Sequence, residues 1–195
     1  MHVRALLAVP SIAAIVLGIG VSGASAATLF TTSAHATRVA VGASWDTTGT
    51  VVFTAPPGTP FLRCHAVLRG TVGANNMTTG VALAVTSGTF GCEERGVAPT
   101  TFPWTVTVLG NGAASGGNLA YKATLDRISF DIDGIGLFAG NLTSGLTALQ
   151  PTAGTAPISI QIAGAGGWST APIPTMQIDT IFPLTGTAAS WSLTN

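Results

Sequence analysis

The chain has 195 residues, of which 7 are basic and 7 acidic, while 47% are hydrophobic, so charge is scarce. Proteins that bind nucleic acids neutralise phosphates with basic patches, and this composition cannot supply one. Long disordered tails are rich in charge and poor in apolar residues, so a mostly disordered chain is excluded as well. The composition indicates a folded domain whose surface is covered by Thr, Ser, Asn, Gly and Ala.

The N-terminal segment has the three-part layout of a secretory signal peptide. Arg4 precedes an uncharged run over Ala5–Val21, and the small residues Ala24-Ser25-Ala26 follow it. A retained membrane anchor is the alternative, but Pro and Gly interrupt the run. We therefore expect residues 1–26 to be removed, which leaves a single domain over 27–195 that is secreted or at the cell surface. No later apolar run reaches spanning length, so the mature chain is predicted to lack a transmembrane segment.

Apolar and polar residues alternate along the mature chain, which is typical of half-buried β-strands. The alternating segments are 51–54, 62–69, 81–86, 104–108, 158–162 and 190–194. Turn-forming residues separate them at 56–58, 73–76, 110–112, 116–118 and 164–167. Helical periodicity is nearly absent. This spacing predicts an all-β fold of roughly ten short strands, arranged as an antiparallel sandwich or a jelly-roll-like structure.

The two cysteines, Cys64 and Cys92, predict a disulfide in an exported protein. Cys64 lies in phase with Leu62 and Leu68, and Cys92 with Phe90, so both are expected to face the core from neighbouring strands. A metal site would need more ligands at closer spacing, and a redox pair usually has the C-x-x-C arrangement.

The alternation of apolar and polar residues shifts by one position between residues 119 and 132. Apolar residues occupy odd positions over 119–125 and even positions over 128–132. Successive side chains of a strand point to opposite faces, so one strand cannot bury both sets on the same side. The change predicts either a β-bulge near Asp126-Arg127 or a corner between two sheets.

No residue set indicates catalysis. The G-x-S-x-G motif of many hydrolases is missing, and His65 alternates outward beside arginines. Asp131 and Asp133 share a strand face and are a weak Ca²⁺ candidate, but a plain exposed face is the favoured explanation. We therefore predict that the protein is not an enzyme and has no cofactor and no metal site.

The tryptophans divide into two groups. Trp104 and Trp191 lie in alternating strands and are expected in the core. Trp168 follows the Gly-rich segment 164–167, which makes it the candidate for a surface contact.

Several short motifs lie in the first half of the mature chain: Gly49–Thr54, Cys64–Val72, Val85–Phe90 with Cys92 soon after, and Phe102–Thr107 with its Pro-Trp pair. Over residues 49–109 the chain resembles the alkane-oxidation activator (PraB-like) family of small bacterial exoproteins. It departs from that family in having no cysteine after Cys92. The resemblance implies an extracellular protein that assists growth on hydrophobic substrates, without catalytic residues.

We expect a non-enzymatic exoprotein or cell-surface protein that acts at a hydrophobic interface. A more specific expectation is an accessory role in growth on alkanes. Its partners would be a hydrophobic surface, cell-wall material or other copies of the chain. A structural or adhesive subunit of the cell envelope is the alternative. A sugar-binding module, a hydrolase and an envelope β-barrel pore form a third group.

Overall fold

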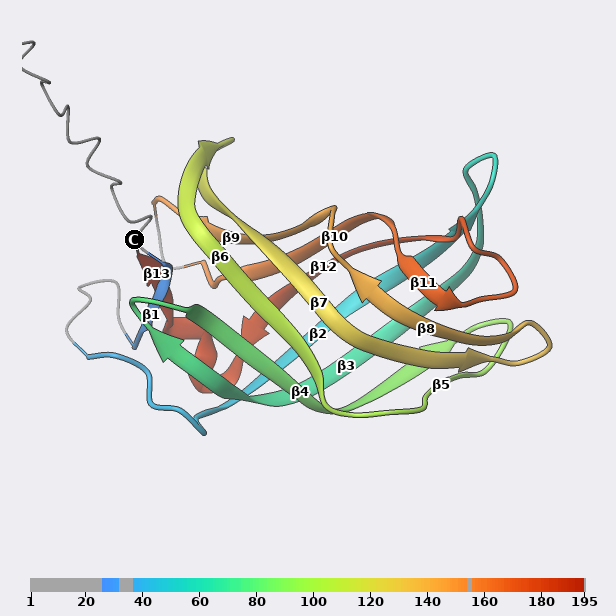
Figure 1. Cartoon of the computed structure of the whole chain (residues 1–195), viewed down its shortest axis with the longest axis horizontal. Helices are drawn as coiled ribbons and strands as arrows, with labels where there is room; N and C mark the ends of the chain where they lie inside the picture. Colours follow the sequence, from blue (N-terminus) through green and yellow to red (C-terminus); the bar gives the residue numbers. More distant parts are fainter. Residues whose placement is uncertain (1–25, 32–36, 154–155, 195) are drawn as a thin grey trace, which may run out of the picture.

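A computed structural model describes residues 26–31, 37–153 and 156–194, and about two-thirds of these residues are in strands (Figure 1). The strands are β1 (Thr28–Phe30), β2 (Ser44–Ala55), β3 (Thr59–Asn76), β4 (Gly80–Cys92), β5 (Val97–Pro99), β6 (Trp104–Ser115), β7 (Asn118–Ile132), β8 (Gly136–Leu142), β9 (Leu146–Pro151), β10 (Ser159–Ala165), β11 (Gly167–Thr170), β12 (Gln177–Thr185) and β13 (Ser192–Thr194). One short 3₁₀ helix, η1, spans Gly186–Ser190. The expected signal peptide, apart from Ala26, lies outside the described residues.

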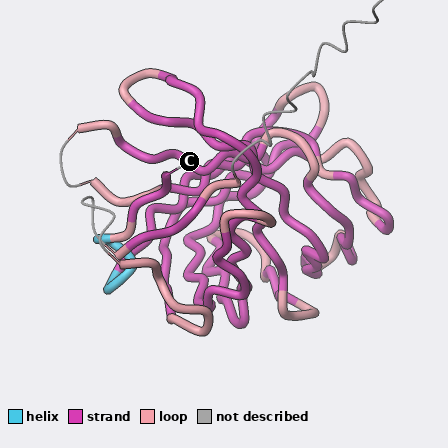
Figure 2. Tube along the Cα trace, turned by 60° about the vertical axis from the view of Figure 1, so that its left-hand side comes forward, coloured by secondary structure: helices cyan, strands magenta, loops and turns pink. Residues whose placement is uncertain are grey.

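The main strands pair in a closed circuit. In chain order β2, β3, β4, β6, β7, β9, β10 and β12 each pair antiparallel with the next, and β12 pairs with β2. In Figure 1, β6 and β7 pass in front of β2 and β12, which gives two layers. Figure 2 shows strands throughout the described chain and the short helix at its margin. The predicted antiparallel all-β sandwich is confirmed, and its connections form an up-and-down meander instead of the Greek key of a jelly roll.

Shorter strands extend this circuit. β5 lies between β4 and β7, β8 pairs with β7, and β11 pairs with β8. β1 and β13 form a separate two-stranded sheet. The buried Asn75 side chain holds this sheet to β3, because its amide accepts from Leu29 N and donates to Leu29 O and Val39 O.

The inward side chains form one hydrophobic cluster, as the alternation predicts. On β3, Leu62, Cys64, Ala66 and Leu68 are buried, whereas Arg63, His65 and Arg69 are exposed. Trp104 and Trp191 are both buried in the core, as expected from their strands.

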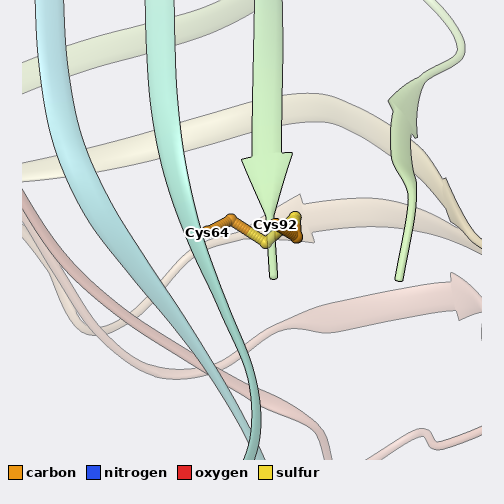
Figure 3. Close-up of a disulfide and its surroundings, with 2 residues drawn as sticks. All are labelled: Cys64 and Cys92. Carbon is orange, nitrogen blue, oxygen red and sulfur yellow. A yellow bond between two sulfur atoms is a disulfide. The ribbon is translucent and has the colours of Figure 1, made fainter. Parts of the chain in front are cut away.

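The predicted disulfide is confirmed. Cys64 and Cys92 lie directly opposite each other on β3 and β4, with their Cα atoms 4.0 Å apart (Figure 3). Cys64 is buried and Cys92 is half-buried, so the bridge fixes the far end of the long β3–β4 ladder at the margin of the core.

The phase change in β7 is a β-bulge, which was the first of the two predicted explanations. Arg127 has a φ of 60°, and the pairing of β7 with β8 shifts register between Leu125 and Ile128. The Arg127 N–H donates to Asn141 Oδ1 at 2.8 Å, which holds this backbone in place. Because the bulge inserts one residue, Leu125 and Ile128 are both buried.

Several predicted turns lie within strands, so these strands are longer than expected. Residues 73–76 belong to β3, which has 18 residues, and residues 110–112 belong to β6. Register shifts absorb both segments, because glycine permits local irregularity without ending the ladder. The turns at 56–58 and 116–117 occur as predicted.

Candidate functional site

A cavity lies inside the closed circuit of strands. Side chains from β2, β3, β4, β6, β7, β10 and β12 line it, and its volume is about 50 Å³. A single water needs roughly 10–15 Å³ by this measure, so the cavity can hold several water-sized atoms. Closure of the circuit places this space between the two layers.

The cavity wall is almost wholly apolar because it is built from the inward positions of alternating strands. It includes Phe53, Val106, Phe130, Ile160 and Ile162, all of which are buried. Phe90 is the lining residue that is only half-buried. Among the described residues, none that lines the cavity is charged. Such a cavity stays dry when empty and favours apolar guests.

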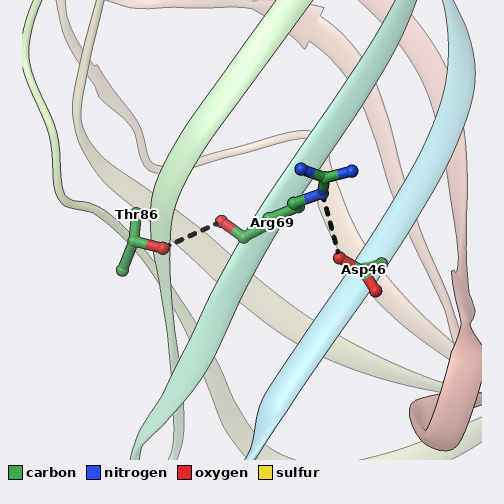
Figure 4. A network of polar contacts seen from close by, with 3 residues as sticks. All are labelled: Asp46, Arg69 and Thr86. Atoms are coloured by element: carbon green, nitrogen blue, oxygen red, sulfur yellow. Dashed lines mark hydrogen bonds and ion pairs between the residues drawn. The ribbon is translucent and has the colours of Figure 1, made fainter.

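The charged groups lie on the outside. Arg69 of β3 and Asp46 of β2 form an ion pair at 3.5 Å with side chains 71% and 54% exposed, and Arg69 O accepts a bond from Thr86 Oγ1 (Figure 4). An ion pair this exposed contributes little to stability. The electrostatic environment of the interior is therefore set by apolar groups and a few neutral polar ones.

Two neutral polar groups of the cavity wall have no hydrogen-bond partner within the described part of the chain. They are Thr180 Oγ1 on β12 and Trp104 Nε1 on β6. Thr47 also lines the cavity, but its hydroxyl donates to Pro183 O at 2.5 Å. Buried polar groups are normally paired, so these two atoms are exceptions, and both lie behind the apolar surface that lines the cavity.

An aromatic cluster covers the wall near Phe130. Trp168 of β11 meets Phe130 and Phe138 edge-on, with ring centroids 5.5 and 5.7 Å away. Its Nε1 donates to Met176 O at 3.2 Å. Trp168, the candidate surface contact, is therefore half-buried against a residue that also lines the cavity. A role in surface contact stays a prediction and concerns only the uncovered part of its ring.

The remaining candidates are not brought together into a site. Asp131 and Asp133 are both exposed, and the described residues contain no group of three or more His, Cys, Asp or Glu side chains that could hold a metal ion. His65 is exposed on β3, and His35 lies outside the described residues. Whether the protein is an enzyme is not decided by these positions, and its non-enzymatic character stays a prediction.

Sequence reasoning missed the cavity and Thr180. The signal was available in part, because Ile178, Thr180, Phe182 and Leu184 alternate with polar or exposed neighbours along β12. An inward threonine in such a series is unremarkable in sequence, since its hydroxyl can bond to the backbone. Only the three-dimensional arrangement shows that it does not.

Comparisons with protein-family models, curated proteins and solved structures found no match for this chain. Within the described residues, no helix is both long enough and apolar enough to cross a membrane.

Proposed function

We propose that this protein is a non-enzymatic exported protein that binds an apolar molecule inside its closed sandwich. The observation that carries the proposal is the cavity, to which seven strands contribute a lining of apolar side chains. Ligand sites are typically concave and mostly apolar, with few polar groups. The hydrophobic partner expected from the sequence would then be taken into the interior.

The outer surface supports this choice of site. The large apolar side chains that are exposed, Val41, Met77, Leu109, Leu137 and Ile181, come from five separate parts of the described chain. Single exposed apolar residues are ordinary on a protein surface and do not by themselves mark a contact site. The cavity is the better candidate for contact with an apolar partner.

The disulfide supports export, because disulfides persist in oxidising compartments outside the cytoplasm. An accessory role in growth on alkanes is the finer proposal, and it rests on the resemblance over residues 49–109. A short aliphatic segment is the kind of guest that the apolar wall favours.

Binding can be tested by titrating the purified protein with xenon, a small apolar probe, and following methyl groups by NMR. The expected shifts fall on methyls of the wall, such as those of Val51, Ile160 and Ile162. Val39 and Leu193 are buried outside the wall and serve as internal controls. Unchanged wall methyls under saturating xenon, or shifts confined to exposed methyls, would refute the proposed function.

A structural or adhesive envelope subunit is the second candidate. It is supported by the sparse charge and by β11, which pairs with one neighbour among the described strands. However, β11 has only 4 residues, and short edge strands are poor templates for pairing with another chain.

Fractionation and growth distinguish the two candidates. If the protein binds an apolar molecule and assists growth on alkanes, it should be found free outside the cell. A deletion strain should then grow poorly on alkane but normally on a soluble carbon source. Equal growth on both substrates, with all protein in high-molecular-weight wall material, would favour the structural subunit.

A further inference from the structure

We propose that a hollow on the outer surface is a second binding site, which takes a sugar unit that carries a carboxylate, and that Arg127 binds this carboxylate. The hollow lies beside the bulge of β7, outside the closed circuit of strands. The inference goes beyond the proposed function and does not depend on it, because the apolar interior cannot accept a charged ligand.

The hollow is formed where four segments of the chain meet. They are residues 101–103 between β5 and β6, the bulge of β7 at 127–129, residues 139–141 of β8, and Ser169 of β11. Strands β7, β8 and β11 lie side by side toward one end of the molecule (Figure 1). The volume of the hollow is about 470 Å³, which falls within the range of small-molecule sites.

Hydrogen bonds hold the rim of the hollow in place. The connection between β5 and β6 is fastened to β7, because Thr100 N–H donates to Ser129 O at 3.1 Å and the hydroxyls of the same two residues bond at 2.5 Å. On the other side, Ser169 Oγ donates to Ala139 O at 2.8 Å and ties β11 to β8. The rim is thus formed without a ligand, which lowers the entropy cost of binding one.

Arg127 is the cation of this site. The bulge gives its backbone a φ of 60°, the only positive φ of a non-glycine residue in the described chain. Asn141 Oδ1 supports this conformation by accepting the Arg127 N–H. The Arg127 side chain is exposed and forms no ion pair with any residue that the structure describes. Strained backbone costs free energy and is found preferentially at functional sites.

The polar groups of the hollow suit a carboxylate. Arg127 is the one charged residue among the described lining residues, so no acid is present there to repel an anion. The Asn141 oxygen is used by the Arg127 N–H, whereas its amide N–H groups have no partner within the described residues. A guanidinium group binds the two oxygens of a carboxylate side by side. Its single charge balances a carboxylate, but not a phosphate monoester with nearly two charges.

The rest of the hollow suits a sugar ring. Phe102 and Pro103 provide an apolar wall for the C–H face of such a ring. The ring of Phe102 is held from behind by Trp104, with ring centroids 4.8 Å apart. The Thr101 hydroxyl can donate to or accept from a sugar hydroxyl, and the Ser169 oxygen can accept. A uronic acid combines these features, because it has an apolar ring face, several hydroxyls and one carboxylate.

The test is an NMR titration of the purified protein with methyl β-D-glucuronide. Methyl β-D-glucoside has the same ring without the carboxylate, and cyclohexanecarboxylate has a ring and a carboxylate without the hydroxyls. The glucuronide should shift the backbone amides of Ser129, Gly140 and Asn141, which line the hollow. It should bind about ten-fold more tightly than either comparison ligand, because only it forms both kinds of hydrogen bond.

Variants separate recognition by Arg127 from general charge effects. R127Q keeps a long side chain on the bulge but removes the charge, so the glucuronide should bind about ten-fold more weakly. R127K keeps the charge without the planar fork and should lie between R127Q and the wild type. R63Q is the matched control, because Arg63 is also an exposed strand arginine but does not line the hollow. It should bind the glucuronide as the wild type does.

Equal binding of glucuronide and glucoside, or wild-type affinity in R127Q, overturns the inference. Cyclohexanecarboxylate that binds as tightly as the glucuronide would show that the hydroxyls are not recognised, which overturns the assignment to a sugar. The xenon titration of the cavity methyls is a separate measurement and should be unchanged in R127Q. Absence of xenon shifts in both proteins would refute the proposed function alone, whereas loss of glucuronide binding with intact xenon shifts in the wild type would refute this inference alone.

Discussion

Gly70 shows how closely the interior is packed at the scale of single residues. A Cβ atom at this position would lie within van der Waals overlap of two neighbours: the Ala84 carbonyl oxygen, which belongs to the backbone, and the Trp45 ring at 2.5 Å. Neither neighbour is the free end of a flexible side chain. The glycine therefore makes room for the indole of Trp45 against β3 and β4.

We expect G70A to lower the free energy of unfolding by about 3 kcal/mol, because overpacking forces the indole or the backbone to move. G73A is the matched control on the same strand, since the nearest atom to its added Cβ is 3.6 Å away. It should change stability by less than about 1 kcal/mol. Urea unfolding followed by tryptophan fluorescence measures both variants, and equal effects would contradict the packing argument.

Tyr121 makes stability depend on alkaline pH. Its side chain is fully buried, its hydroxyl has no partner in the described chain, and burial raises its pKa above the ordinary value of 10.0. The folded state thus holds the phenol proton more tightly than the unfolded state does. The resulting stabilisation is complete below pH 10 and is lost as the pH rises through the raised pKa.

Y121F should therefore lose less stability than the wild type between neutral pH and about pH 11. Near neutral pH the substitution should be neutral or stabilising, because it removes an unsatisfied hydroxyl from the core. Urea midpoints at several pH values provide the measurement. Parallel pH profiles for the two proteins above pH 10 would show that Tyr121 is not the responsible group.

At the scale of elements, the bulge in β7 controls which residues face the core. The backbone of Arg127 adopts the left-handed helical conformation, which β-branched residues strongly disfavour and glycine adopts without strain. R127G should raise the free energy of unfolding by up to about 1 kcal/mol, and R127V should lower it by about 2 kcal/mol. Thermal melts of both variants test this order, and a glycine variant less stable than the valine variant would contradict it.

The elements also show what the sequence could predict. Alternation over 62–69 and the phase change at Asp126-Arg127 are local patterns, and both the buried faces and the bulge follow from them. The prediction that strands end at 73–76 and 110–112 is wrong. Glycine and asparagine indicate irregular backbone there, but irregular backbone can remain within a hydrogen-bonded strand pair. Asn75 illustrates this, because its side-chain amide forms hydrogen bonds with the backbone of Leu29 in β1 and does not stabilise a turn.

Closure of the sheet could not be predicted, because no local pattern specifies that β2 pairs with β12. The cavity depends in turn on that closure and on how side chains from opposite walls fill the space. For the same reason Thr180 could not be distinguished from Thr47 in sequence. Their difference is that the Thr47 hydroxyl donates to Pro183 O, whereas the Thr180 hydroxyl has no partner in the described chain.

The whole molecule should unfold as one unit, because the buried apolar residues of the described chain form a single cluster. Reduction of the Cys64–Cys92 bridge, which closes a loop of 28 residues, should lower the free energy of unfolding. The chain-entropy relation gives about 3.5 kcal/mol for this loss. Circular dichroism and fluorescence should report the same midpoint before and after reduction, and separate transitions would contradict the single core.

The closed circuit also has a consequence for the order of events during biosynthesis. β12 is made after the other seven strands of the circuit, yet it must pair with β2, the first of them. Until β12 emerges, the seven earlier strands form at most an open sheet whose apolar face is uncovered. Contacts between segments so distant in sequence are slow to form. We therefore expect the incomplete chain to expose its apolar face until β12 docks against β2.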